Sequence, residues 1–164
     1  QDGSGTMKDT DRSVQEMWEG CLVKIDEEKK TTNMTYQSWY FCDNEDDANE
    51  LVELVMAGTK RGTASLHILY ELANERIPEA GDLNVLTDWD GIARCIIRDK
   101  NVTIVPFKDI SEEHAMIEGE GDKSLEYWRR AHINFFTREL EGMGAEFNED
   151  VLVVFEEFEV VFKF

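Results

Sequence analysis

Basic residues are scarce in this chain of 164 residues. It has 17 Lys and Arg against 36 Asp and Glu, which gives a net charge of −19. Proteins that follow a nucleic-acid backbone carry a basic surface, so this balance argues against a long duplex nucleic acid as a partner. It argues equally against an anionic membrane. It does not exclude a small ligand, or one nucleotide held by a local group of cations.

Cysteines and long apolar runs are scarce too. The chain has three cysteines, Cys21, Cys42 and Cys95, and they form no CxxC pair. An odd number at this spacing argues against a disulfide framework and favours a reducing cytoplasm. No 18-residue apolar stretch is present, so no transmembrane helix is expected. The three histidines lack a metal-binding spacing, so the sequence predicts neither a metal nor another cofactor.

The organisation expected along the chain is simple. Residues 1–13 have the composition of a tag remnant or a disordered leader, with Met7 as the first native residue. Residues 14–164 have a suitable length for a single domain, and nothing in them resembles a linker. A monomer or a homodimer fits this organisation.

Periodicity predicts an α+β fold. Helical spacing of apolar residues or a capping residue predicts helices over 14–26, 48–57, 111–118 and 124–140. Residues 27–38 are polar and are predicted to be a loop. Apolar, β-rich runs predict strands over 63–72, 83–87, 92–98, 102–106 and 151–162, with a hairpin turn at residues 88–91. No βαβ alternation is visible, so we expect a mostly antiparallel, barrel-like sheet.

The first candidate for chemistry is the segment Gly58-Thr-Lys60-Arg61-Gly-Thr63. It places a cation and a hydroxyl three residues apart at a helix-to-strand junction. Such a junction exposes backbone N–H groups and is suited to binding an anion or activating the hydroxyl. The alternative is a solvated loop whose cations complement the end of the preceding helix. The segment is not a P-loop, because Gly-x-x-x-x-Gly-Lys-Ser/Thr is absent.

The second candidate is the acidic segment Glu118-Gly-Glu120-Gly-Asp122-Lys-Ser124. Clustered carboxylates raise one another's pKa, which suits a general acid or base. The alternative is a flexible loop in which Asp122 or Ser124 caps the following helix.

The third candidate is the helix predicted over residues 124–140. His132 follows Trp128 by four residues, or about one turn. A histidine there is either a base or ligand, or a packed and hydrogen-bonded side chain.

Taken in order, these motifs resemble those of the ASCH domain family. They are Gly58-x-Lys60-x-x-Thr63, Pro78-x-x-Gly81-Asp82 and His114-Ala-x-x-Glu118-Gly-Glu-Gly-Asp-x-Ser-Leu-x-x-Trp128-x-x-x-His132. The resemblance covers roughly residues 14–164 and is greatest to a bacterial subfamily with the signature EGEGDxSLxxW. It implies a PUA-like fold, in which helices and an N-terminal helical extension surround a small antiparallel β-barrel.

The resemblance also implies a function. Small bacterial members hydrolyse the acetamide of acetylated cytidine with a Lys, a Thr and a Glu, which correspond here to Lys60, Thr63 and Glu118. Lys60 would act either as a base or as a stabiliser of negative charge. Further residues expected to bind the nucleoside-type ligand are Gly58, Arg61, Ser65, Glu120, Asp122, Trp128, Arg129 and His132.

A second function fits the same cleft. The chain would then be a non-catalytic RNA-binding or RNA-processing module, or a ribonuclease, that holds a short RNA segment. Arg61, Arg129 and Arg130 would contact phosphates, and an aromatic residue such as Trp39 would stack on a base.

Overall fold

The computed structural model describes residues 10–29 and 34–164. Most of the leader predicted for residues 1–13 lies outside this range, and the first helix begins at Arg12. The described helices are α1 (Arg12–Lys29), α2 (Glu45–Met56), α3 (His67–Ala73), the 3-10 helix η2 (Phe107–Asp109), α4 (Glu112–Glu118) and α5 (Leu125–Glu141). The described strands are β1 (Tyr36–Trp39), β2 (Gly62–Leu66), β3 (Leu83–Thr87), β4 (Ala93–Pro106) and β5 (Leu152–Phe162).

The five described strands form one mixed sheet in the order β1-β3-β4-β5-β2. β1 pairs with β3 in parallel, and the other pairings are antiparallel. The turn between β3 and β4 confirms the hairpin expected at residues 88–91. The α+β class and the N-terminal helix are confirmed. In the described part of the chain, β1 and β2 lie at the two ends of the sheet, so its closure into a barrel stays a prediction.

The strand predicted over residues 63–72 is wrong in its second half. β2 ends at Leu66, and helix α3 follows at once and ends at Asn74 in the left-handed conformation. The apolar, β-rich composition favoured a strand there. However, Tyr70 is buried and Leu69 partly buried while the residues beyond them are exposed, which a helix of two turns explains better than a strand.

Two other boundaries differ from the prediction. The loop expected over 27–38 contains the end of α1 and most of β1. β1 is too short and too polar to be recognised as a strand from the sequence pattern. The strands expected at 92–98 and 102–106 are one strand, β4. It continues through Lys100 and Asn101 because β5 pairs along almost its whole length, with register shifts near Ile96 and Asp99.

Helices α1 and α2 cover opposite faces of the β3–β4 hairpin. Val85 and Ile96 belong to the core cluster on the α1 side. Leu86 and Ile97 belong to the cluster on the α2 side, together with Val52 of α2. Because successive residues of a strand point to opposite faces, a strand covered on both faces needs apolar residues in succession.

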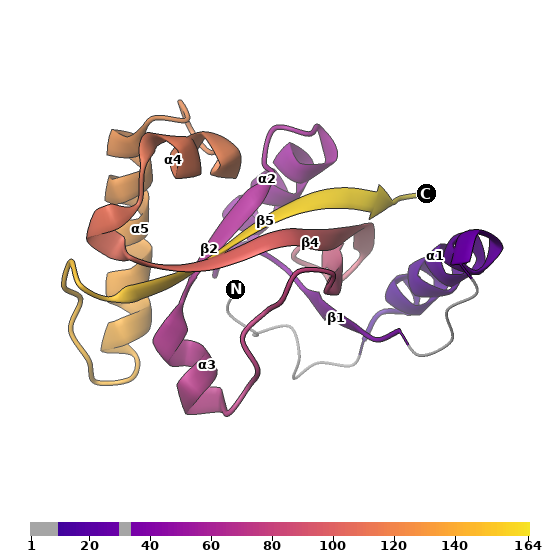
Figure 1. Ribbon diagram of the computed structural model, residues 1–164, viewed down its shortest axis with the longest axis horizontal. Helices are drawn as coiled ribbons and strands as arrows, with labels where there is room; N and C mark the ends of the chain where they lie inside the picture. The colour runs from indigo at the N-terminus through magenta and orange to yellow at the C-terminus, as the bar shows by residue number, and fades with distance from the viewer. Residues whose placement is uncertain (1–9, 30–33) are drawn as a thin grey trace.

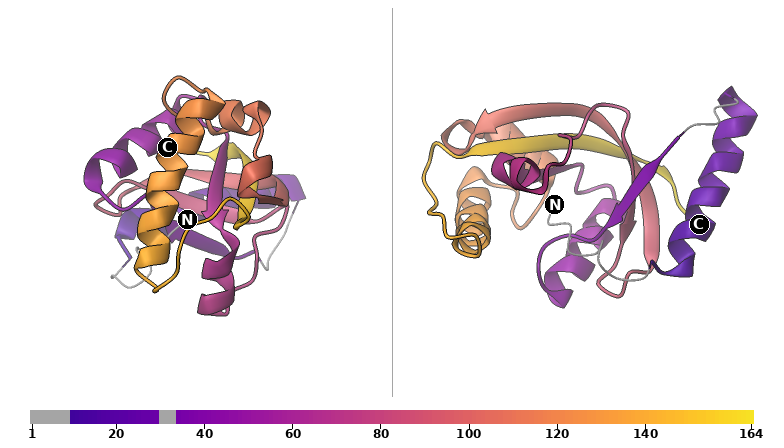
Figure 2. Two further views of the ribbon diagram at one scale, coloured as in Figure 1. Left: turned by 90° about the vertical axis from the view of Figure 1, so that its left-hand side faces the viewer. Right: turned by 90° about the horizontal axis from the view of Figure 1, so that it is seen from below.

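A third core cluster lies at the other end of the sheet. Ala64 of β2 and Phe155 of β5 pack there with Ala115 of α4 and with Trp128 and Phe136 of α5. Helices α1 and α5 thus lie at opposite ends of the molecule (Figures 1 and 2). None of the helices in residues 10–29 and 34–164 has the length and apolar character needed to cross a membrane.

Candidate functional site

The loop after α2 is shaped by backbone hydrogen bonds. Gly58 has φ of +80°, a conformation that suits glycine at the end of a helix. The backbone N–H groups of Thr59 and Lys60 both donate to the carbonyl of Leu54. The N–H of Arg61 then donates to the carbonyl of Ile117 in α4. The loop is therefore fixed to two helices just before β2 begins.

Helix α4 ends against this loop. Ser111 caps its start in a capping box with His114, and Gly119 ends it with φ of +68°. A Cβ atom on Gly119 would collide with the carbonyl of Thr59, so only glycine permits this approach. The close contact brings Glu118, the last residue of α4, to the side chain of Lys60.

The Lys60 ammonium is the centre of the site. Its Nζ donates to the carbonyl oxygen of Gly62 at 2.8 Å, to Oε2 of Glu118 at 3.2 Å and to Oε2 of Glu120 at 2.7 Å. The side chain is only 1% exposed. Burial alone would lower the pKa of Lys60, but the charges of Glu120 and Glu118 outweigh burial and raise it. Lys60 is therefore a buried, charged ammonium.

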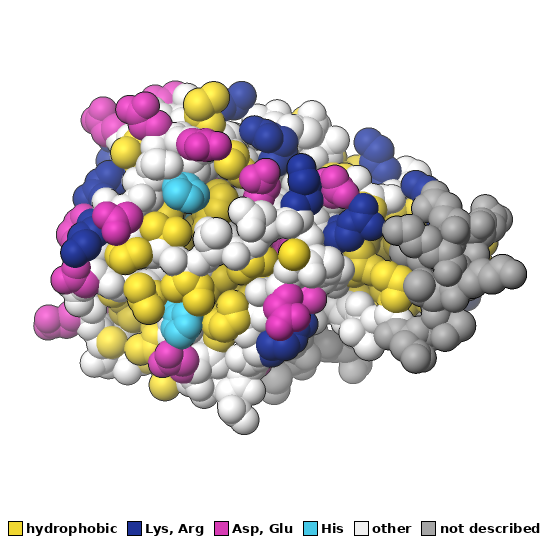
Figure 3. Space-filling model, in the orientation of Figure 1, with side chains coloured by type: hydrophobic (Ala, Val, Ile, Leu, Met, Phe, Trp, Pro, Cys, Tyr) yellow, Lys and Arg dark blue, Asp and Glu magenta, His cyan; other side chains and the backbone are white. Residues whose placement is uncertain are grey.

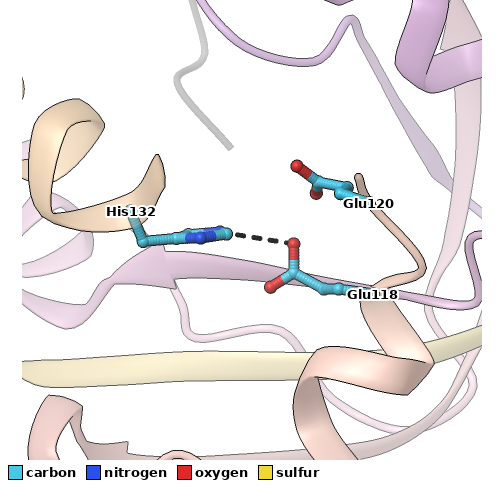
Figure 4. Close-up of side chains that lie close together, drawn as sticks. All are labelled: Glu118, Glu120 and His132. Carbon is cyan, nitrogen blue, oxygen red and sulfur yellow. Dashed lines mark ion pairs between the residues drawn. The ribbon is translucent and has the colours of Figure 1, made fainter. Parts of the chain in front are cut away.

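Helix α5 supports Glu118 from the other side. The indole Nε1 of Trp128 donates to Oε1 of Glu118 at 2.8 Å. His132 lies one turn later, stacked on Trp128 with ring centroids 4.0 Å apart. Its Nδ1 lies 2.8 Å from the carbonyl oxygen of Trp128, and its Nε2 lies 3.3 Å from Oε2 of Glu118 (Figure 4).

These contacts favour the doubly protonated form of His132. A carbonyl oxygen only accepts hydrogen bonds, so Nδ1 must carry a proton. Nε2 faces a carboxylate oxygen, which also accepts. Burial would lower the pKa of His132, but the charge of Glu118 outweighs it and raises the pKa. The imidazolium is thus the form that satisfies both neighbours.

The two carboxyl groups differ in character. Burial would raise the pKa of Glu118, but Lys60 and then His132 lower it well below its ordinary value. For Glu120, burial raises the pKa and the charge of Glu118 adds to the rise, while Lys60 opposes it. Glu118 is therefore the charged partner in the resting site, and Glu120 holds a proton more readily.

These groups line a cavity of about 150 Å³. Thr63, the second residue of β2, contributes its side chain beside Lys60 and is 4% exposed. The five sequence-predicted residues that line the cavity are Lys60, Thr63, Glu118, Glu120 and His132. The three residues expected to carry the chemistry are among them.

The other predicted residues do not line this cavity. Ser65 is buried, and its hydroxyl is hydrogen-bonded to Tyr70. Gly58 and Arg61 line a separate hollow beyond the loop. The backbone N–H of Ser124 donates to Asp122, at the start of α5.

Trp128 and Arg129 also lie outside the cavity. Trp128 does not line the cavity, but it contacts Glu118 and His132, which do. Arg129 pairs with Glu149 at 2.8 Å on the surface. The Trp39 side chain, expected to stack on a base in an RNA complex, is 1% exposed and donates to Asn84, so that expectation is wrong.

Several cavity residues were not predicted. One face of α2 provides four of them, and α5 provides a second row next to His132. The full unpredicted set is Phe41, Cys42, Asp47, Glu50, Leu51, Leu54, Ala64, Gly121, Tyr127, Ala131, Phe135 and Arg138. The α2 residues are spaced i, i+3, i+4 and i+7, so they lie on a single helical face. This spacing is visible in the sequence, but it points to the cavity only when the position of α2 in the fold is known.

Glu118, Glu120 and His132 each offer a ligand atom, and these atoms lie within 4.8 Å of one another. This set alone resembles a metal site. However, the Lys60 ammonium already contacts both carboxylates, and a divalent cation there would face it at close range. The electrostatics thus favour the lysine as the resident cation.

On the face that Figure 3 shows, Lys and Arg side chains stand between Asp and Glu side chains. The described part of this face carries no continuous basic track.

A hydroxyl, a buried ammonium and a carboxylate backed by an imidazolium are suited to attack on a polarised carbonyl group.

Comparisons with known proteins identify a family for this chain. Residues 37–162 match the family model described as ASCH domain. The solved structure of an ASCH domain from Lactobacillus crispatus JV V101 is 38% identical, with a TM-score of 0.87 over 93% of this chain and 96% of that one. Protein EF3133 from Enterococcus faecalis V583 is 31% identical, with a TM-score of 0.80 over 92% of this chain and 88% of that one. No curated protein matches the chain.

Proposed function

Because the chain belongs to the ASCH domain family, we propose that it is a metal-independent amidohydrolase acting on an acylated nucleoside or a similar small amide. The observation that carries this proposal is the meeting of Lys60, Thr63 and Glu118 at one small cavity. The order of the motifs, including EGEGDxSLxxW, further suggests membership of the bacterial subfamily with that signature.

The proposed reaction begins at Thr63. Its Oγ1 attacks the amide carbonyl carbon, and the Lys60 ammonium stabilises the negative charge that develops on the carbonyl oxygen. The raised pKa of Lys60 supports this role over that of a base. Glu118, with a proton supplied by the His132 imidazolium, protonates the departing amine. Water then releases the acyl group from Thr63.

The RNA-binding or ribonuclease alternative has less support. Its example of a stacking aromatic was Trp39, and that side chain is buried. It also used Arg61, Arg129 and Arg130 for phosphates, and the last two have acidic partners at 2.8 and 3.9 Å. A cavity of about 150 Å³ suits a small ligand better than a strand of RNA.

A paired assay tests the proposal. Purified protein is incubated with N4-acetylcytidine, and cytidine release is measured in parallel with binding of short RNAs across a salt titration. We expect nucleoside turnover, and its loss in Lys60→Ala with the fold retained. Tight RNA binding that weakens steeply with salt, without turnover, would support the RNA module instead.

Other properties follow from the same proposal. The cavity residues need no cofactor for this chemistry, and the partner is a small molecule. The described cysteines Cys21, Cys42 and Cys95 are free thiols, which supports a reducing compartment such as the cytoplasm.

A further inference from the structure

Two carboxyl groups outside the described site lie fully buried on neighbouring strands. Asp99 of β4 and Glu156 of β5 are each 1% exposed. Both carboxyl oxygens of Asp99 and Oε2 of Glu156 are sealed from solvent and make no hydrogen bond of ordinary geometry to another group. Such groups are rare in folded proteins, because an unpaired buried polar atom costs free energy.

Strand register places Glu156 next to the Thr63 hydroxyl. Glu156 is the direct cross-strand partner of Thr63 in the β2–β5 ladder. Directly opposed residues point to the same face, with Cβ atoms about 5 Å apart. Asp99 is the cross-strand partner of Phe158 in the β4–β5 ladder. Phe158 lies two residues after Glu156, so Asp99 and Glu156 point to the same face of the sheet. A row of polar side chains therefore runs from Thr63 at the cavity to Glu156 and Asp99 behind it.

The proposed reaction leaves one task unassigned. The attack of Thr63 releases its hydroxyl proton, and a group must accept it. Lys60 is a charged ammonium held by two carboxylates, and His132 already carries both of its protons. Glu118 is strongly held by Lys60, His132 and Trp128, which makes it a poor base.

We propose that Glu156, which lies beside Asp99, accepts the proton of Thr63 when that hydroxyl attacks the substrate. This inference rests on the proposed function. The bond from Thr63 Oγ1 to the carbonyl carbon forms while its proton passes to the Glu156 carboxylate. The C–N bond then breaks as the amine receives a proton from His132 through Glu118. In the second half, water replaces Thr63 on the acyl carbon, its proton returns to His132, and Thr63 recovers its own proton from Glu156.

The surroundings of the pair suit a single shared proton. Burial raises the pKa of Asp99 to about 9, and the charge of Glu156 adds to this rise. Burial also raises the pKa of Glu156, while the contact with Asp99 opposes the rise. Asp99 therefore keeps its proton at neutral pH, and its contact lowers the pKa of Glu156 toward the range in which a carboxylate accepts a proton. The other titratable groups facing them are Asp82, Lys60 and Tyr70, with Arg76 on the wall of the adjoining small cavity.

The test compares pH profiles of kcat/KM for N4-acetylcytidine in the wild type, Glu156→Gln, Glu120→Gln and Glu157→Gln. Glu156→Gln keeps the side-chain shape but removes the proton acceptor, so kcat/KM should fall about 100-fold or more. The decline of kcat/KM at low pH, which is the acidic limb of the profile, should also vanish. Glu157 lies next in β5 and points to the other face, so its variant should retain the wild-type profile.

Three outcomes would overturn the proposal. An unchanged acidic limb in Glu156→Gln rejects the role of Glu156, and loss of that limb in Glu120→Gln assigns the proton to Glu120. A wild-type chain without any turnover rejects the reaction itself. Infrared spectroscopy tests the carboxyl pair independently of any enzymatic activity. We expect a protonated-carboxyl band at pH 7 that Asp99→Asn removes. Absence of this band from the wild type would reject the shared proton.

Discussion

The indole Nε1 of Trp128 donates a 2.8 Å hydrogen bond to Oε1 of Glu118, which lies at the end of a different helix. Glu118 Oε2 is taken by Lys60 and His132, so each oxygen of this buried carboxylate has a partner. The geometry of the charged cluster thus depends on a side chain that never touches the cavity.

Trp128→Phe should therefore lower the free energy of unfolding by more than the smaller buried ring alone explains. The variant leaves a buried carboxylate oxygen without its donor, at a cost of about 2 kcal/mol. Trp18→Phe is the matched control, since Trp18 is 8% exposed and packs against Tyr36. Urea denaturation measures the free energy of unfolding of both variants. Equal losses would show that the hydrogen bond contributes nothing.

The charge of His132 predicts a dependence of stability on pH. Its folded-state pKa is raised above the unfolded value of 6.5, and the charge of Glu118 outweighs burial in causing the rise. The stability it contributes is fully present below pH 6.5 and is lost as pH rises through the folded-state pKa.

Glu118→Gln should reverse this shift, because burial then acts on His132 with its main carboxylate partner removed. An NMR titration of the His132 ring measures the change directly. Glu71→Gln, which removes a carboxylate beside His67, is the control and should leave the titration of His132 in place. A His132 that titrates identically in the wild type and in Glu118→Gln would contradict the assignment of the imidazolium.

Lys60→Met should turn the cluster into a metal site. The variant removes the ammonium and leaves two carboxylates and an imidazole with ligand atoms within 4.8 Å. His132 would then donate Nδ1–H to a carbonyl and offer Nε2, the usual arrangement of a metal-binding histidine. We expect zinc binding by calorimetry in Lys60→Met but not in the wild type, and its loss when His132→Phe is added.

The same electrostatics predict how the wild type responds to chelators. EDTA should leave the proposed amide hydrolysis unchanged, because Lys60 already supplies the positive charge. Loss of turnover in EDTA with recovery on adding zinc or manganese would contradict this role of Lys60. Lys60→Met should also be about 3–5 kcal/mol less stable than the wild type, since it breaks a buried ion pair.

Gly119 should be intolerant of a side chain. Its φ is +68°, and a Cβ atom would meet the backbone of Thr59 and Lys60. Gly144→Ala is the matched control, because Gly144 has φ of +74° and open space around it. The backbone strain common to both variants costs about 1 kcal/mol, and the collision in Gly119→Ala adds about 1–3 kcal/mol. Thermal unfolding measures both, and equal losses would argue against the close approach of the loop to α4.

The sequence predicted the members of the charged cluster better than their arrangement. Lys60, Thr63 and Glu118 were recognised from the order and spacing of motifs, and the caps at Ser111 and Ser124 follow local rules that any sequence displays. What brings them together is long-range: the N–H of Arg61 donates to Ile117, 56 positions along the chain. No local pattern encodes such a contact.

The missed features share the same cause. β1 has four residues and is recognised only through its pairing with β3. The cavity face of α2 is recognised only through the position of that helix over the sheet. Glu156 reads as a solvated position in an alternating strand, yet it is buried on the sheet face that it shares with Thr63. Burial of this kind depends on tertiary structure and not on the pattern of one strand.

The most direct test concerns the hydroxyl of Thr63. The initial rate of N4-acetylcytidine hydrolysis is measured for the wild type, Thr63→Ser, Thr63→Val and the loop control Thr59→Val, each with its fold verified by circular dichroism. Serine retains the nucleophile and valine removes it, so we expect turnover in Thr63→Ser and Thr59→Val and none in Thr63→Val. Turnover by Thr63→Val at the wild-type rate would contradict the proposed site.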